Sequence, residues 1–157
     1  MKRFLVGYMA SGKSRYGRTL AAAEGVRFFD LDRYIEEREH RTINEIFRDS
    51  GEAHFRKLES RYLHELCELY EDFILSCGGG APCFNDNMEY MNSQGVTIFL
   101  NPSIDTIVAR LIRGKWKRPL VAKLSDQELR EYVEKHLAER LPYYNMAKEQ
   151  VKNEDEN

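Results

Sequence analysis

The chain has 157 residues, a length that suits one domain with a single hydrophobic core and is too short for two. Its acidic and basic residues nearly cancel to a formal net charge of −2, so the composition lacks the basic character typical of proteins that bind nucleic acids or anionic membranes. The three cysteines form no CxxC pair, and no segment approaches the ~20 apolar residues that span a bilayer. These features predict a cytoplasmic protein with reduced thiols that binds neither nucleic acid nor membrane.

The first half of the chain predicts strands that alternate with helices. Residues 3–7 ("RFLVG") are a compact apolar run typical of a buried strand, and residues 15–24 predict a helix. Residues 26–32 ("VRFFDLD") predict a second strand that ends in two aspartates. Helical composition over 33–51 stops at a glycine, and residues 52–71 predict a further helix because apolar side chains recur every three or four positions.

The second half continues this alternation. Residues 73–77 predict a third strand, which is closed abruptly by three consecutive glycines at 78–80. Residues 96–101 ("VTIFLN") predict a fourth strand, and a helix is predicted over about 102–112. The residues that follow, 113–123, form a polar and cationic loop.

The C-terminal part predicts a last helix over about 125–140, because Pro142 interrupts the helical pattern. Only "EQVKN" at 149–153 could add a weak fifth strand. Strands that alternate with helices indicate a single α/β domain, in which helices flank a mostly parallel sheet. Ligands of such sheets bind at the carboxyl ends of the strands, so the segments that follow the strands should converge there.

The segment "GYMASGKS", from Gly7 to Ser14, matches the phosphate-binding pattern G-x-x-x-x-G-K-[ST] in full. In such a loop, backbone N–H groups surround phosphate oxygens, Lys13 reaches the β- and γ-phosphates, and the Ser14 hydroxyl binds magnesium. An ordinary glycine-containing turn is the alternative, but the strand before and the helix after favour a phosphate site. The motif leaves the reaction open, because GTPases, ATP-driven machines and small-molecule kinases share it.

Two further segments at strand ends contain candidate functional residues. Asp30 and Asp32 lie two apart at the end of a predicted strand, so their side chains should point the same way. One carboxylate could hold magnesium through water while the other receives a hydroxyl proton; helix capping by Asp32 is the alternative. The glycines 78–80 offer bare amides against which a ligand could lie, although a simple loop would also fit.

Arginines are the remaining candidates. Arg56 on a predicted helix is followed one turn later by Glu59, and an ion pair between them could aim the guanidinium. A solvated helix face is the alternative for this pair. Arg118 and Arg140 each lie near a proline, in "KRPLV" and "ERLPYY", and neither would stand out by itself. Tyr8 occupies a variable position of the glycine loop and is assigned no function, and the four histidines are expected to be surface or helix-packing residues.

Taken together, "GYMASGKS", "DLD", "FRKLE", "SCGGGAP", "KRPL" and "RLPYY", in this order and at these spacings, resemble the shikimate kinases over nearly the whole chain. The resemblance implies a three-layer P-loop kinase domain over residues 1–157. Within it, the resemblance implies a mobile lid at about 113–125 and a shikimate-binding region at about 30–60. It also implies transfer of the ATP γ-phosphate to the 3-hydroxyl of shikimate, with ATP and Mg²⁺, in aromatic amino-acid biosynthesis.

The resemblance further implies a role for individual residues. The catalytic residues would be Lys13, Asp32 and Arg118, with Asp32 as the acceptor of the hydroxyl proton. Magnesium would be held by Ser14 directly and by Asp30 and Ser76 through water. The ATP-binding residues would be Gly7, Ala10, Ser11, Gly12, Lys13, Ser14, Arg15, Arg110 and Arg118. The shikimate-binding residues would be Asp32, Arg56, Gly78, Gly79, Gly80 and Arg140, with the arginines Arg56 and Arg140 on the carboxylate.

One departure from the family and two alternative functions follow. Family members usually continue through the fifth strand into a final helix, for which this sequence has no residues, so an apolar patch on the sheet could favour self-association of an otherwise monomeric protein. One alternative function is a kinase of another small acceptor, such as gluconate or a nucleoside monophosphate. The other is a nucleotide-binding switch without transferase activity.

Overall fold

The structure is a computed structural model that describes residues 1–114 and 119–154. Its strands form one fully parallel sheet of five strands in the order β2-β3-β1-β4-β5. The sheet confirms the predicted α/β fold, including the weak fifth strand. The strands are β1 (Lys2–Val6), β2 (Arg27–Asp30), β3 (Phe73–Ser76), β4 (Val96–Leu100) and β5 (Glu149–Val151).

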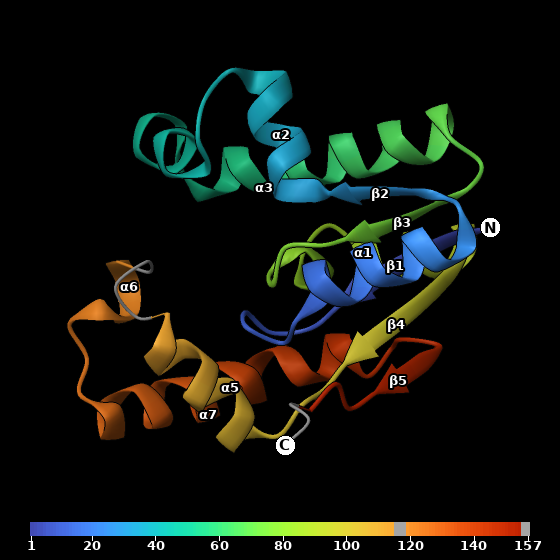
Figure 1. Cartoon of the computed structure of the whole chain (residues 1–157). Coiled ribbons are helices and arrows are strands. Elements are labelled where there is room, and N and C mark those ends of the chain that lie inside the picture. The colour runs from blue at the N-terminus through green and yellow to red at the C-terminus, as the bar shows by residue number, and fades with distance from the viewer. Residues whose placement is uncertain (115–118, 155–157) are drawn as a thin grey trace.

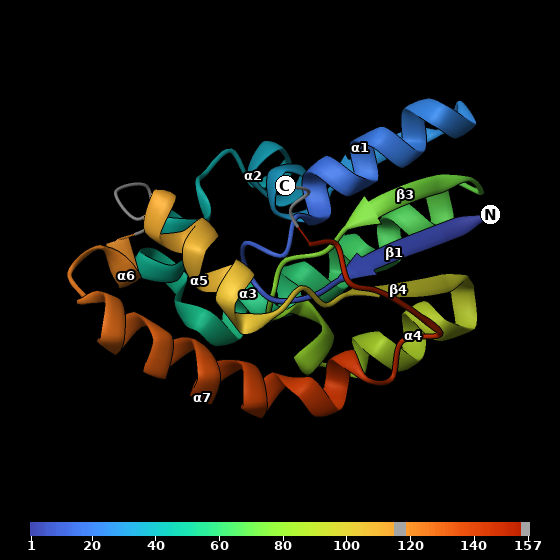
Figure 2. The same cartoon turned by 60° about the horizontal axis from the view of Figure 1, so that its bottom comes forward.

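Helices cover both faces of this sheet. Figure 2 shows α1 on one face of the sheet, with α4 and α7 on the opposite face. In Figure 1, α2 and α3 lie toward the β2 edge, whereas α5, α6 and α7 lie toward the other edge. The helices are α1 (Lys13–Glu24), α2 (Leu31–Glu39), α3 (Ile43–Leu69), α4 (Asn87–Gln94), α5 (Ile104–Arg113), α6 (Pro119–Ala122) and α7 (Asp126–Tyr144), with a short 3₁₀ turn η1 (Ala81–Cys83).

The alternation of side chains along the central strand explains these layers. Phe4 and Val6 of β1 point into the larger core, where Leu63 of α3 also packs. Leu5 points to the opposite face and packs in a smaller core with Ala21 of α1. Because both faces of the strand are apolar and buried, each needs a layer of helices, and the result is the predicted three-layer architecture.

The predicted helix over 33–51 is in fact two helices. α2 ends at Glu39, because the left-handed backbone of the following residue, His40 (φ 55°), breaks the helix. Thr42 then caps α3 through a capping box with Glu45. Gly51, predicted to end a helix, instead kinks α3, because its φ of 84° lies outside helical geometry.

The structure differs from the predicted elements at three further places, all in the C-terminal half of the chain. The helix α7 runs through Pro142 to Tyr144, about one turn beyond the predicted end at residue 140. α4 and η1 were not predicted, and α4 begins only after Asn85 and Asp86 both adopt left-handed backbone conformations. The predicted cationic loop contains the short helix α6, and Arg118 lies outside the described residues.

Candidate active site

The glycine loop connects β1 to α1 at the carboxyl end of the central strand. Gly7 and Gly12 have φ values of 152° and 88°, a region that L-residues rarely adopt. A Cβ atom on Gly7 would also lie only 2.7 Å from the carbonyl oxygen of Leu100. The loop therefore needs glycine at both positions, and the N-terminus of α1 behind it adds partial positive charge.

Lys13 lies buried along the inside of the loop. Its Nζ donates hydrogen bonds to the carbonyl oxygens of Gly7 (2.7 Å) and Tyr8 (3.0 Å). The ammonium group is thus held within the curve of the loop, close to the backbone amides that the motif offers to phosphates.

Ser14 and Asp30 form the oxygen-rich side of the site. The Ser14 hydroxyl donates to Asp30 Oδ2 at 3.2 Å, which ties the start of α1 to the end of β2. Ser76 pairs with Asp30 in the register of β2 and β3, so the side chains of these two residues lie at adjacent strand ends, beside Ser14 at the start of α1. Hydroxyl and carboxylate oxygens are the donors that Mg²⁺ prefers, and Mg²⁺ sites commonly use few protein ligands together with substrate phosphates and waters. The set of residues therefore fits magnesium.

A cavity of about 330 Å³ opens between the glycine loop and the ends of β2 and β3. Most of the residues predicted to bind the substrates line it. Met9 and Cys77 line it as well and were not predicted. The predicted residues that line it are Ala10, Gly12, Lys13, Ser14, Arg15, Asp30, Asp32, Ser76, Gly78 and Gly79.

Asp32 lines this cavity from the start of a helix, not from the end of a strand as predicted. The strand β2 ends at Asp30, which caps α2 by accepting a hydrogen bond from the amide of Arg33 (3.3 Å), so Asp32 lies in the first turn of the helix. The strand-alternation argument for the two aspartates was therefore wrong, and Asp30, not Asp32, is the cap. Both carboxylates nevertheless face the same cavity.

The environment of Asp32 raises its proton affinity. Asp32 Oδ1 is buried and has no hydrogen-bond partner within the described part of the chain. Burial, followed by the charge of Asp30, raises the pKa of Asp32 to about 6, and Lys13 opposes this shift. A carboxylate with such a pKa is suited to take up a proton near neutral pH.

The three consecutive glycines each lie against one charged side chain. A Cβ atom on Gly78 would lie 2.9 Å from Asp32 Oδ1. The corresponding atom on Gly79 would lie 3.0 Å from Arg140 Nη1, and that on Gly80 would lie 2.5 Å from Arg56 Nη2. The charged groups come from α2, α7 and α3 respectively, so three helices converge on one stretch of bare backbone beside the glycine loop.

Arg56 is held in place from several sides. Its guanidinium donates to the buried Glu59 at 2.9 Å, the ion pair that the sequence allowed beside the alternative of a solvated helix face, and also to Glu52 at 3.4 Å. Burial raises the pKa of Glu59 to about 7, against the opposing effect of Arg56. The ring centroid of Phe84 lies 4.2 Å from the guanidinium carbon. Phe84 was not predicted because its segment between η1 and α4 shows no helix or strand pattern.

Arg110 lies on the other side of the glycine loop. It donates to the carbonyl oxygens of Ala10 (3.1 Å) and Asn153 (2.8 Å). Asn153 in turn donates from its side chain to the Ser11 carbonyl oxygen at 2.8 Å. The segment after β5 thus borders the phosphate loop, a contact that no sequence pattern indicated.

The close approach at Gly80 gives a prediction that does not depend on removing a charge. Gly80→Ala should raise KM for shikimate, the ligand that the resemblance implies for Arg56, about 10-fold or more, because the new methyl group must displace the Arg56 guanidinium and at least one charged hydrogen bond is lost. The backbone of Gly80 is right-handed helical (φ −90°, ψ −15°), so alanine introduces no backbone strain. Steady-state kinetics of Gly80→Ala, Arg56→Ala and the double variant would test this.

In the double variant the two effects should not add, because both act through the same guanidinium. Full additivity, or an unchanged KM in Gly80→Ala, would contradict the contact.

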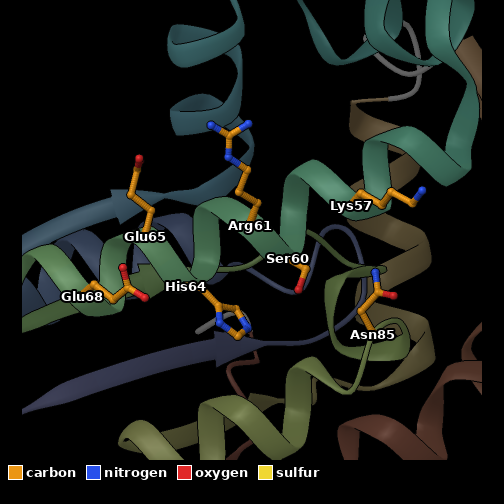
Figure 3. Close-up of a pocket in the computed structure, with 7 residues that line it drawn as sticks. All are labelled: Lys57, Ser60, Arg61, His64, Glu65, Glu68 and Asn85. Atoms are coloured by element: carbon orange, nitrogen blue, oxygen red, sulfur yellow. The ribbon is translucent and has the colours of Figure 1, made fainter.

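A larger hollow of about 610 Å³ lies on the outer side of α3 (Figure 3). Figure 3 shows that Arg61 and Glu65 point to one side of the helix, whereas Ser60 and His64 point to the other. Glu65 already accepts a hydrogen bond from Tyr34 at 2.5 Å. Because its polar groups do not converge, this hollow lacks the features of the cavity beside the glycine loop.

Comparisons with known proteins agree with this geometry. The family model for shikimate kinase matches residues 9–157. The shikimate kinase of Parabacteroides distasonis is 47% identical over 148 residues, which cover 94% of this chain and 85% of the relative. The crystal structure of the shikimate kinase from Bacteroides thetaiotaomicron superimposes with a TM-score of 0.94 at 44% identity, covering 100% of this chain and 89% of that one.

A more distant structure, the shikimate kinase from Acinetobacter baumannii in complex with shikimate, gives a TM-score of 0.81 at 31% identity and covers 99% of this chain and 84% of that one. At 15% identity, the deoxyadenosine kinase from M. mycoides shares the fold alone, with a TM-score of 0.62. The match of sequence and structure along almost the entire chain shows that it belongs to the shikimate kinase family.

Proposed function

We propose that this chain transfers the γ-phosphate of ATP to the 3-hydroxyl of shikimate and releases shikimate 3-phosphate and ADP. This places it in the shikimate pathway of aromatic amino-acid biosynthesis. The observation that carries the proposal is the convergence of Asp32, Arg140 and Arg56 on Gly78–Gly80, beside a phosphate-binding loop. One buried carboxylate and two arginines suit an acceptor that presents both hydroxyl groups and a carboxylate.

The two arginines would bind the carboxylate of shikimate. A guanidinium group is planar and can donate two parallel hydrogen bonds to a carboxylate. Arg56 and Arg140 lie against adjacent positions of the glycine segment, so the acceptor ring would rest on bare backbone between them. This arrangement would fix the acceptor hydroxyl relative to the phosphate loop, and such positioning supplies much of the rate of phosphoryl transfer.

Asp32 and Lys13 would carry the chemical step. The 3-oxygen attacks the γ-phosphorus while the bond between that phosphorus and the β,γ-bridging oxygen breaks, and the hydroxyl proton passes to the Asp32 carboxylate. The Lys13 ammonium group would exchange its hydrogen bonds to the loop carbonyls for contacts with the phosphate oxygens, and would neutralise the charge that spreads over them. Arg118, which lies outside the described residues, would add a further positive charge from a lid over about 113–125.

The remaining roles concern the metal and the nucleotide. Ser14 would bind Mg²⁺ directly, and Asp30 and Ser76 would bind it through water. When bound, this ion neutralises phosphate charge and orients the triphosphate. Arg110 would lie near the adenine, and the amides of the glycine loop would bind the phosphates. The proposed loop residues are Gly7, Ala10, Ser11, Gly12, Lys13, Ser14 and Arg15.

The cellular setting belongs to the same proposal. No helix in residues 1–114 or 119–154 has the length and apolar character that a membrane crossing requires. A cytoplasmic enzyme that acts as a monomer, without nucleic-acid or membrane partners, fits the near-neutral charge. Self-association is the alternative, and sedimentation at increasing concentration would distinguish the two.

An ADP-release assay with a panel of acceptors tests the function. We expect release of ADP to depend strongly on shikimate, and gluconate or a nucleoside monophosphate to give no comparable rate. Turnover with gluconate or a nucleotide but none with shikimate would show a kinase of another acceptor. Slow ADP release that ignores every acceptor would show a nucleotide-dependent switch.

A further inference from the structure

Helix α7 carries a stripe of four ring-bearing or charged side chains, the last two of which reach the active site. Tyr132, His136, Arg140 and Tyr144 recur every four residues, so they lie on one face of the helix. The Tyr144 hydroxyl donates to the Gly79 carbonyl oxygen at 2.5 Å. The stripe thus ends at the same glycine against which Arg140 lies.

Tyr8 of the phosphate loop packs against the middle of this stripe. Its side chain is 1% exposed, and its hydroxyl lies 2.9 Å from His136 Nδ1. The rings of Tyr8 and His136 meet edge to face with centroids 5.4 Å apart. The guanidinium carbon of Arg140 lies 5.9 Å from the centroid of the Tyr8 ring.

The same residue also faces the nucleotide side of the site. The backbone carbonyl oxygen of Tyr8 accepts a hydrogen bond from Lys13 Nζ at 3.0 Å. Tyr8 is therefore in contact with the lysine expected to bind phosphate and with the arginine expected to bind the acceptor. Its hydrogen bond with His136 joins the loop to α7 across 128 positions of the sequence.

The surroundings of this hydrogen bond favour the neutral form of both partners. Burial raises the pKa of the Tyr8 hydroxyl well above its usual value, so the hydroxyl keeps its proton. Burial and the neighbouring Arg140 lower the pKa of His136, which favours a neutral imidazole. Tyr8 and His136 are therefore two neutral partners in this hydrogen bond. The neutral ring adds no positive charge one helical turn from Arg140.

We propose that Tyr8 is a positioning residue that orients Arg140 toward the acceptor carboxylate, through its hydrogen bond to His136 and its ring beside the guanidinium. The proposal rests on the proposed function of the chain, because it assumes that Arg140 binds the acceptor. An arginine side chain is long and has many rotamers, so holding its end in one place reduces the entropy lost on binding. Tyr8 and His136 would provide this restraint from the loop and from the helix.

Tyr8→Phe tests the restraint because it removes only the hydroxyl. We expect KM for shikimate to rise about 2- to 10-fold, as for the loss of one hydrogen bond, while kcat and KM for ATP change less than about 2-fold. Tyr143→Phe is the matched control, since Tyr143 lies on the same helix but is 42% exposed and outside the stripe. His136→Gln provides a second variant that alters the other partner, and the melting temperature of each variant shows whether it folds.

The decisive comparison uses an Arg140→Ala background. If Tyr8 acts through Arg140, Tyr8→Phe should cause no further rise in KM for shikimate there. An equal rise with and without Arg140, or an increase in KM for ATP in place of KM for shikimate, would overturn the proposal. So would an unchanged KM for shikimate in both Tyr8→Phe and His136→Gln. Failure of the proposed function would instead be seen as absent shikimate turnover in the unaltered chain.

Discussion

Asp32→Asn should lower kcat about 10²- to 10⁴-fold, the usual effect of removing a general base, with little change in KM for ATP. Asparagine preserves the size of the side chain, so it fits against Gly78 as aspartate does. It cannot accept the hydroxyl proton, and this is the physical reason for the loss. Steady-state kinetics with shikimate as the varied substrate measure it.

Asp49→Asn is the matched control. Asp49 is exposed on α3 and pairs with Arg48 at 2.9 Å, so the same substitution there should leave kcat within about 2-fold. A kcat for Asp32→Asn close to that of the unaltered chain would remove this carboxylate from the chemical step. The only role left for Asp32 would then be contact with the acceptor hydroxyls.

The pKa of Asp32 predicts how activity depends on pH. Because burial raises this pKa to about 6, the group is a carboxylate above about pH 6 and a neutral acid below it. A neutral acid cannot accept the proton, so kcat/KM should fall as the pH is lowered through about 6. Glu59, whose pKa is raised to about 7, titrates in a similar pH range. The Glu59→Gln variant distinguishes the two groups, because the fall of kcat/KM near pH 6 should remain in it if Asp32 is the group that titrates.

Lys13→Ala should give the second large loss, about 10²- to 10³-fold in kcat, together with weaker binding of ATP. The ammonium group lies in the curve of the loop, where the spreading charge of the transferred phosphoryl group requires a cation. Lys135→Ala is the control, since Lys135 is exposed on α7 and away from the cavity.

The Lys13 substitution also tests the loop as a structural element. Two hydrogen bonds from the ammonium to loop carbonyls are lost, so the melting temperature should fall as well. Isothermal calorimetry with ADP would show whether the remaining amides still bind phosphate. A variant with normal kcat would show that Lys13 does not stabilise the transferred group.

Local chemistry explains which elements the sequence could predict. The strand β1 and the glycine loop can be predicted from short stretches of sequence. The φ values of 152° at Gly7 and 88° at Gly12 favour glycine whatever the rest of the fold is. The break before α3 could have been found as well, because Thr42 and Glu45 have the spacing of a capping box. Helix α4 could not, because it starts without a side-chain cap and follows two residues in left-handed conformations.

The sequence by itself determined the α/β fold class, the phosphate loop and the family, because motifs in a fixed order carry that information. Only the tertiary structure decided that Asp32, Arg140 and Arg56 each meet one of Gly78, Gly79 and Gly80. It alone also brought Tyr8 to His136. These contacts join residues far apart in the chain. They depend on the strand order β2-β3-β1-β4-β5 and on the approach of three helices to the segment that follows the carboxyl end of β3. No local pattern encodes such a convergence, because it is the product of the whole fold.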